Sequence, residues 1–129
     1  MKGAHLLLDV SGSMSKFKRA AKNACIKAGS KNPILCFGDN KVAEVAISDL
    51  NKINLNGGTP GWEALEEAAQ NGWEEIVLIS DLAFNGKEFN PGNFGDNFKK
   101  ITVVLPQLYE ESTLLEIKNI TEEVEIIKL

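Results

Sequence analysis

The chain has 129 residues, of which 43% are hydrophobic and 25% charged, values typical of a single soluble globular domain over residues 1–129. Its formal net charge of −4 argues against a general nucleic-acid-binding protein, which normally has a basic surface. The apolar run near the N-terminus is too short for a secretion signal or a membrane span, so we expect a cytoplasmic protein that does not contact a membrane. Cys25 and Cys36 lack CxxC spacing, and we expect both thiols to be reduced and buried.

The first part of the chain predicts a strand, a helix and a hairpin. Residues 4–8 form an apolar run that is typical of a strand buried on both faces. Over residues 17–28 apolar side chains recur at helical spacing, and the basic side chains opposite them are interpreted as a solvated helix face. Residues 34–37 predict a second buried strand. The turn Gly38-Asp39-Asn40 then predicts an antiparallel hairpin to an edge strand over 41–47.

A glycine-rich loop precedes the second long helix. Residues 49–55 are short and irregular, residues 56–61 form the loop, and Pro60 is suited to the first turn of the helix, which ends at Asn71-Gly72. We expect the apolar residues of this helix to face the core and its glutamates to face water. These residues are Trp62, Leu65, Ala68 and Ala69 on the inner side, and Glu63, Glu66 and Glu67 on the outer side.

The second half of the chain alternates again between strands and helices. Residues 76–79 predict a clearly buried strand, and residues 82–100 predict a loop with one or two short helical turns. A strand over 101–105, a helix over 110–120 and a last strand over 124–129 follow. Four phenylalanines in the long loop either pack in the core or form an apolar rim at the sheet edge: Phe84, Phe89, Phe94 and Phe98.

This element order predicts an α/β fold, a Rossmann-like three-layer αβα sandwich. Its six-stranded sheet should be mainly parallel, with the third strand as an antiparallel edge strand. In such sheets functional groups gather beyond the carboxyl ends of the strands. Asp9 ends the first strand, Asp81 follows the fourth, and Thr59 lies in the loop before the second long helix. We therefore expect all three side chains at one edge of the sheet.

The side chains expected at this edge carry oxygen donors only. They are Asp9, Ser11, Ser13, Thr59 and Asp81. A set without histidine or cysteine favours Mg²⁺, with Mn²⁺ or Ca²⁺ as alternatives, over zinc or copper. Because hydroxyl groups are neutral, a metal ion held largely by them should attract one more anionic oxygen from outside the chain.

Three segments resemble the parts of one known motif. Asp9-Val10-Ser11-Gly12-Ser13-Met14, Gly57-Gly58-Thr59-Pro60 and Ile79-Ser80-Asp81 are similar to the metal-ion-dependent adhesion site of von Willebrand factor A domains. The predicted element order, with its antiparallel third strand, is also that of the family. One departure is Leu82, which stands where family members often have glycine.

The resemblance implies a role for each site residue. Ser11 and Ser13 would bind the metal directly through their hydroxyls, and Thr59 would do so when a ligand is present. Asp9 and Asp81 would act mainly through bound waters and by hydrogen-bonding the serines. A glutamate or aspartate from a protein partner would complete the coordination sphere.

We therefore expect a metal-dependent protein–protein interaction domain, an adaptor or a subunit of a larger assembly, and not an enzyme. By resemblance, intracellular members often work beside ATPases. A metal-dependent phosphatase is an alternative, because Asp9 stands where haloacid-dehalogenase-type enzymes place a nucleophile, but Ser11 occupies the position of the second acid that they need. RNA binding is supported only by the basic helix face. His5 lies inside a strand and is expected to be structural.

Overall fold

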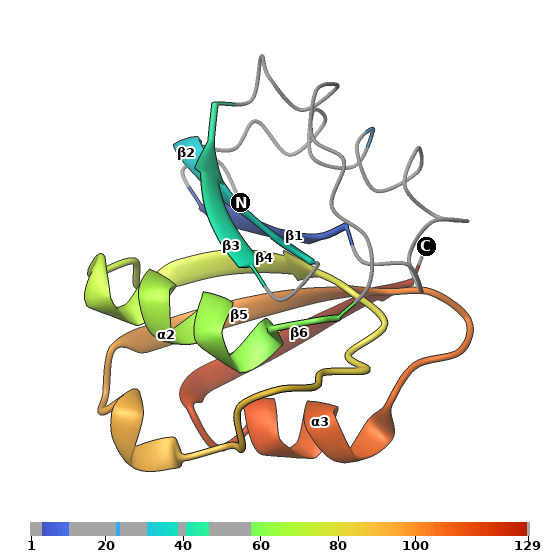
Figure 1. Ribbon diagram of the computed structural model, residues 1–129. Helices are drawn as coiled ribbons and strands as arrows, with labels where there is room; N and C mark the ends of the chain where they lie inside the picture. Colours follow the sequence, from blue (N-terminus) through green and yellow to red (C-terminus); the bar gives the residue numbers. More distant parts are fainter. Residues whose placement is uncertain (1–3, 11–22, 24–30, 39–40, 47–57, 129) are drawn as a thin grey trace.

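A computed structural model describes residues 4–10, 23, 31–38, 41–46 and 58–128 of the chain (Figure 1). The elements in chain order are β1 (His5–Asp9), β2 (Lys31–Gly38), β3 (Lys41–Val45), α2 (Gly61–Gln70), β4 (Glu75–Ile79), the 3₁₀ turn η3 (Pro91–Asn93), β5 (Phe98–Leu105), α3 (Glu111–Ile117) and β6 (Thr121–Lys128). No helix in this described part of the chain is long and apolar enough to span a membrane.

The strands form one six-stranded sheet in the order β3-β2-β1-β4-β5-β6. Every neighbouring pair is parallel except β2 and β3, which run antiparallel with β3 at the edge. The predicted α/β class and mainly parallel sheet with an antiparallel third strand are therefore confirmed. From β1 to β3 the strands follow one another toward one edge of the sheet, and from β4 to β6 they follow one another toward the other edge. The strand order thus reverses between β1 and β4, where doubly wound sheets bind their ligands.

The central strands of the sheet are buried on both faces. On one face α2 and α3 share a core with alternate strand residues, for example Leu78 of β4 with Leu65 of α2 and Ile117 of α3. On the opposite face, Leu8 and Ile79 are each 1% exposed. Apart from residue 23, the predicted first helix over 17–28 lies outside the described residues, as do the irregular stretch 49–55 and Cys25. Cys36 is buried in β2.

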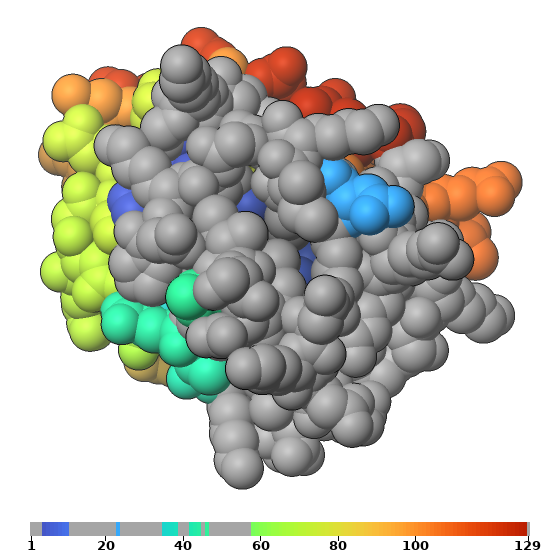
Figure 2. Space-filling model, turned by 90° about the horizontal axis from the view of Figure 1, so that it is seen from above, coloured from blue at the N-terminus to red at the C-terminus, as the bar shows by residue number. Residues whose placement is uncertain are grey.

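Near the edges of the sheet, the observed ends of elements differ from the predicted ones. β5 begins at Phe98 rather than at residue 101, because Phe98 already pairs with Thr121 of β6. Polar Lys100 is tolerated in this strand because its ammonium lies 3.0 Å from the Glu125 carboxylate on the edge strand. At the other edge, Asn71 beyond α2 contacts Glu44 of β3, and Figure 2 shows α2 and β3 side by side at the surface.

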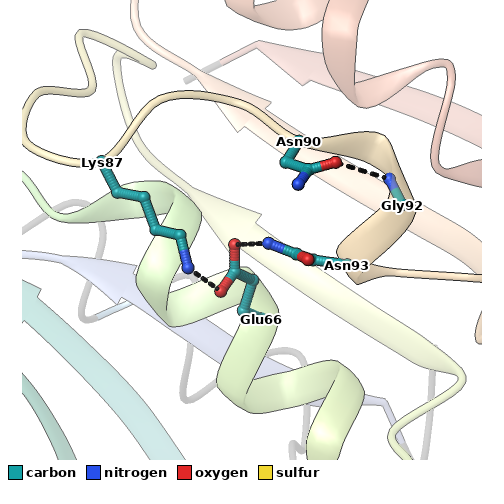
Figure 3. A network of polar contacts seen from close by, with 5 residues as sticks. All are labelled: Glu66, Lys87, Asn90, Gly92 and Asn93. Carbon is teal, nitrogen blue, oxygen red and sulfur yellow. Dashed lines mark hydrogen bonds and ion pairs between the residues drawn. The ribbon is translucent and has the colours of Figure 1, made fainter.

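The glutamates of α2 do not face water as predicted. Glu66 is only 9% exposed, and its carboxylate accepts from Lys87 Nζ at 2.7 Å and Asn93 Nδ2 at 3.1 Å (Figure 3). Glu63 and Glu67 are half-buried, and each has one buried oxygen that finds no hydrogen-bond partner in the described part of the chain. The prediction was wrong because the β4–β5 segment (residues 80–97) folds back over Glu63 and Glu66, while Glu67 lies near Glu44 of β3. Helical periodicity cannot show such contacts.

The phenylalanines of that segment pack into the core, which excludes the alternative of an apolar rim. Phe94 and Phe98 are buried, while Phe84 and Phe89 are partly buried against the core. Trp62 of α2 links them: its ring centroid lies 5.2 Å from that of Phe84, 4.5 Å from Phe89 and 6.2 Å from Phe94. These contacts hold the segment against α2.

We predict that Glu67→Gln stabilises the protein at neutral pH. Burial, and then repulsion by Glu44, raise the pKa of the Glu67 carboxyl above its ordinary 4.5. The folded state therefore holds the proton more tightly than the unfolded state, and stability falls as pH rises above 4.5. Urea unfolding at pH 7 should show a gain of about 0.5 kcal/mol for the variant, shrinking towards zero near pH 4. Exposed Glu88→Gln is the control, and an equal gain in both variants would contradict this explanation.

Candidate metal centre

The carboxyl ends of the two central strands are joined by one short hydrogen bond. β1 ends at Asp9, and Ser80 follows β4 directly. Their side chains are 1% and 0% exposed. Ser80 Oγ donates to Asp9 Oδ2 at 2.6 Å, a charge-assisted bond that offsets part of the cost of burying a carboxylate. The bond also fixes the orientation of the Asp9 side chain at the point where the strand order reverses.

Asp81 begins the segment that leaves β4. It is half-buried, and its Oδ1 accepts from the backbone N–H of Ala83 at 3.1 Å, which leaves Oδ2 without a hydrogen bond from the described residues. The Asp81 backbone oxygen accepts from Glu110 N at 2.9 Å, so the loop after β5 supports this position. Asp81 is thus the residue after Ser80, and one of its two carboxylate oxygens takes no part in this turn.

Leu82 takes up a backbone conformation that favours glycine. Its φ is +63°, in the left-handed region that costs other residues roughly 1 kcal/mol. Two features offset this cost. The Leu82 side chain is fully buried, and its backbone N–H donates to Ser80 Oγ at 2.9 Å. The chain therefore makes the turn after Asp81 with leucine in place of glycine.

Thr59 is tied to the same segment. It is 3% exposed, and its backbone N–H donates to Asn85 Oδ1 at 2.8 Å, while Asn85 N–H donates back to Thr59 O at 2.9 Å. Next to this pair, the Phe84 ring lies so close to the Gly61 backbone that a Cβ there would overlap it. Glycine at the start of α2 thus permits the loop and the Asp81 segment to meet.

Three of the five predicted site residues are consequently linked. Asp9 contacts Ser80, Ser80 precedes Asp81, and Asn85 of the Asp81 segment holds Thr59. Ser11 and Ser13 lie outside the described residues. His5 is far along β1 from this edge, and its ring stacks on Trp73 with centroids 3.9 Å apart, a structural role as expected.

Sequence reasoning assigned no role to two residues of this site. The sequence did contain a signal for Ser80, because the residue that follows a strand parallel to β1 is expected to lie beside Asp9. The observed pairing of Leu8 with Ile79 places Ser80 in that position. For Asn85 there was no signal, because its partner Thr59 is 26 residues away and belongs to an irregular loop.

The donor types of the predicted site suit a hard cation. Two carboxylates at neighbouring strand ends repel each other, and a divalent cation between them removes that cost. Among the described residues, no group of three or more His, Cys, Asp and Glu side chains is arranged to hold a metal ion. The predicted ligand set contains only two side chains of these types, because its other three donors are hydroxyl groups. Its described members, Asp9, Thr59 and Asp81, fit Mg²⁺ in donor chemistry.

No protein-family model matches the chain, and no curated protein matches it.

We predict that Ser80→Ala strongly destabilises the fold. The substitution removes the Ser80 donor from the buried carboxylate of Asp9, which should lower the free energy of unfolding by about 1.5–3 kcal/mol. The matched control is Ser112→Ala, which removes an exposed serine-to-carboxylate bond to Glu110 of 3.1 Å and should cost less than about 0.5 kcal/mol. Urea unfolding measures both. Similar losses in the two variants would mean that the Asp9 contact contributes little.

We predict that Gly61→Ala costs about 1–3 kcal/mol, because the added methyl group overlaps the Phe84 ring. That ring cannot move aside freely, since it packs edge-on against Phe37 and Trp62. In a Phe84→Ala background the same glycine substitution should be almost neutral. A double-mutant cycle measured by chemical unfolding tests this, and equal losses in both backgrounds would contradict the steric explanation.

Proposed function

We propose that the chain is a von Willebrand factor A-like domain that binds a divalent cation through Asp9, Ser11, Ser13, Thr59 and Asp81. Mg²⁺ is the favoured ion, with Mn²⁺ and Ca²⁺ as alternatives. The hydrogen bond between Ser80 and Asp9 carries this proposal, because it joins the carboxyl ends of β1 and β4 and so brings Asp9 beside the Asp81 strand end. The reciprocal bonds between Thr59 and Asn85 add the hydroxyl-bearing loop to the same edge.

The proposed role of the metal is to capture a protein partner. With three neutral hydroxyls among five donors, the cation keeps enough positive charge to bind one more carboxylate, supplied by a glutamate or aspartate of the partner. We propose that the protein is a cytoplasmic adaptor or a subunit of a larger assembly, for which an ATPase-associated complex is one candidate. Membrane and nucleic-acid partners are not part of this proposal.

Binding is favoured over catalysis by the state of Asp9. A phosphatase of the haloacid-dehalogenase type would need this carboxylate as an accessible nucleophile. Here the residue is 1% exposed, and its Oδ2 accepts a hydrogen bond of 2.6 Å from Ser80. A carboxylate held in this way is better suited to orient other ligands of a metal than to attack a substrate.

The proposal predicts that Mg²⁺ stabilises the wild-type protein and that Asp9→Asn and Asp81→Asn lose this response. A ligand that binds only the folded state at about 100 times its Kd adds about 2.7 kcal/mol. Thermal unfolding with Mg²⁺ and with EDTA measures the effect. The control is Asp96→Asn, because Asp96 is exposed and lies near the start of β5, away from the site. The isosteric asparagines limit any change of packing.

Partner capture gives the second readout of the same proposal. Proteins retained on the immobilised chain in Mg²⁺ should be released by EDTA and should not be retained by the Asp81→Asn variant. If millimolar Mg²⁺, Mn²⁺ and Ca²⁺ all leave the unfolding temperature unchanged, the metal-centre proposal is wrong. Hydrolysis of a phosphate ester that requires Asp9 would favour the phosphatase alternative.

A further inference from the structure

We propose that Asn85 is a positioning residue for Thr59 and thereby sets the affinity of the metal centre. This inference rests on the proposed function and adds to it a residue outside the predicted donor set. Asn85 engages both backbone polar groups of Thr59: its Oδ1 accepts from Thr59 N at 2.8 Å, and its N–H donates to Thr59 O at 2.9 Å.

The pair matters because Thr59 lies outside any helix or strand, where its backbone has one other hydrogen bond from the described residues, donated by Gly61 N to Thr59 O at 2.9 Å. Residues 58–60 belong to no helix or strand, and a glycine precedes the threonine. A backbone of this kind samples many conformations, and a ligand must be held closely in place to bind a metal well. Two hydrogen bonds to one partner fix the peptide groups on both sides of the Thr59 Cα, and hence the position from which its hydroxyl extends.

The partner also belongs to the segment that carries a site carboxylate. Asn85 is connected to Asp81 by a tight turn in which Ala83 N donates to Asp81 Oδ1 and Phe84 N donates to Leu82 O at 2.8 Å. Any displacement of Thr59 must therefore break its bonds to Asn85 or displace the Asp81 turn as well. The arrangement couples the hydroxyl ligand on one loop to the carboxylate on another.

Asn85 has no evident core role that would explain the contact otherwise. Asn85 is exposed, and toward the described residues it engages only its amide oxygen and its backbone N–H. A second attachment of the same segment lies farther along: Lys87 and Asn93 hold Glu66 of α2, as Figure 3 shows, without touching Thr59. That attachment provides a matched control for general loosening of the segment.

The first test compares variants of Asn85 for Mn²⁺ and Mg²⁺ affinity by calorimetry. Asn85→Leu keeps the size of the side chain but removes the acceptor, and we expect affinity to fall about tenfold. Asn85→Asp keeps an acceptor for Thr59 N and should stay within about threefold of wild type. Lys87→Met, which loosens the segment elsewhere, should leave affinity unchanged. Thermal unfolding in EDTA reports separately on the stability of each metal-free variant.

The second test asks whether Asn85 acts through the Thr59 hydroxyl. In a Thr59→Val background, where that hydroxyl is absent, Asn85→Leu should have no further effect on Mn²⁺ affinity. An equal loss in both backgrounds would assign Asn85 a merely structural role and overturn the inference. Wild-type affinity in Asn85→Leu, with weakened binding in Thr59→Val, would also overturn it while leaving the metal centre intact. If the wild-type protein binds neither metal, the proposed function itself fails, and the inference with it.

Discussion

The arrangement of the sheet edge at the carboxyl ends of β1 and β4 depends on a carboxylate buried at the end of β1. Asp9 is 1% exposed, and a buried charge of this kind costs several kcal/mol unless it is hydrogen-bonded. Ser80 supplies a bond of 2.6 Å from the next strand, and its Oγ also accepts from Leu82 N at 2.9 Å. One serine hydroxyl thus connects the end of β1, the end of β4 and the first turn of the segment that follows.

The β4–β5 segment is attached along the length of α2. After the left-handed turn at Leu82, Asn85 is bonded to Thr59, Lys87 is paired with Glu66, and Asn97 Nδ2 donates to Trp73 O at 2.8 Å. The segment therefore follows the helix from its first residue to the turn beyond its last. Attachment at several points explains how a stretch with only one short 3₁₀ turn holds a candidate ligand loop in position.

The strands and their arrangement were largely predictable because burial on both faces leaves a clear record in sequence. Apolar runs such as residues 76–79 indicated central strands, and the charged hairpin strand with Lys41 and Glu44 indicated the edge. Boundaries moved where polar residues enter a strand, as at Lys100, whose charge is balanced by Glu123 and Glu125 of the neighbouring strand. The glutamates of α2 were misplaced because helical periodicity describes one helix and not what folds over it.

By itself, the sequence determined which residues end the central strands, and that was enough to predict Asp9 and Asp81 at one edge. The carboxyl ends of parallel strands share an edge whatever the side chains do there. Only the tertiary structure decided which neighbours hold them. Ser80 reaches Asp9 across 71 residues of sequence, and Asn85 reaches Thr59 across 26, and both contacts depend on strand order and on the path of an irregular segment. No local pattern encodes the pair of Asn85 and Thr59, because it exists only when two distant parts of the backbone meet, whereas the place of Ser80 after a strand parallel to β1 did indicate a position beside Asp9.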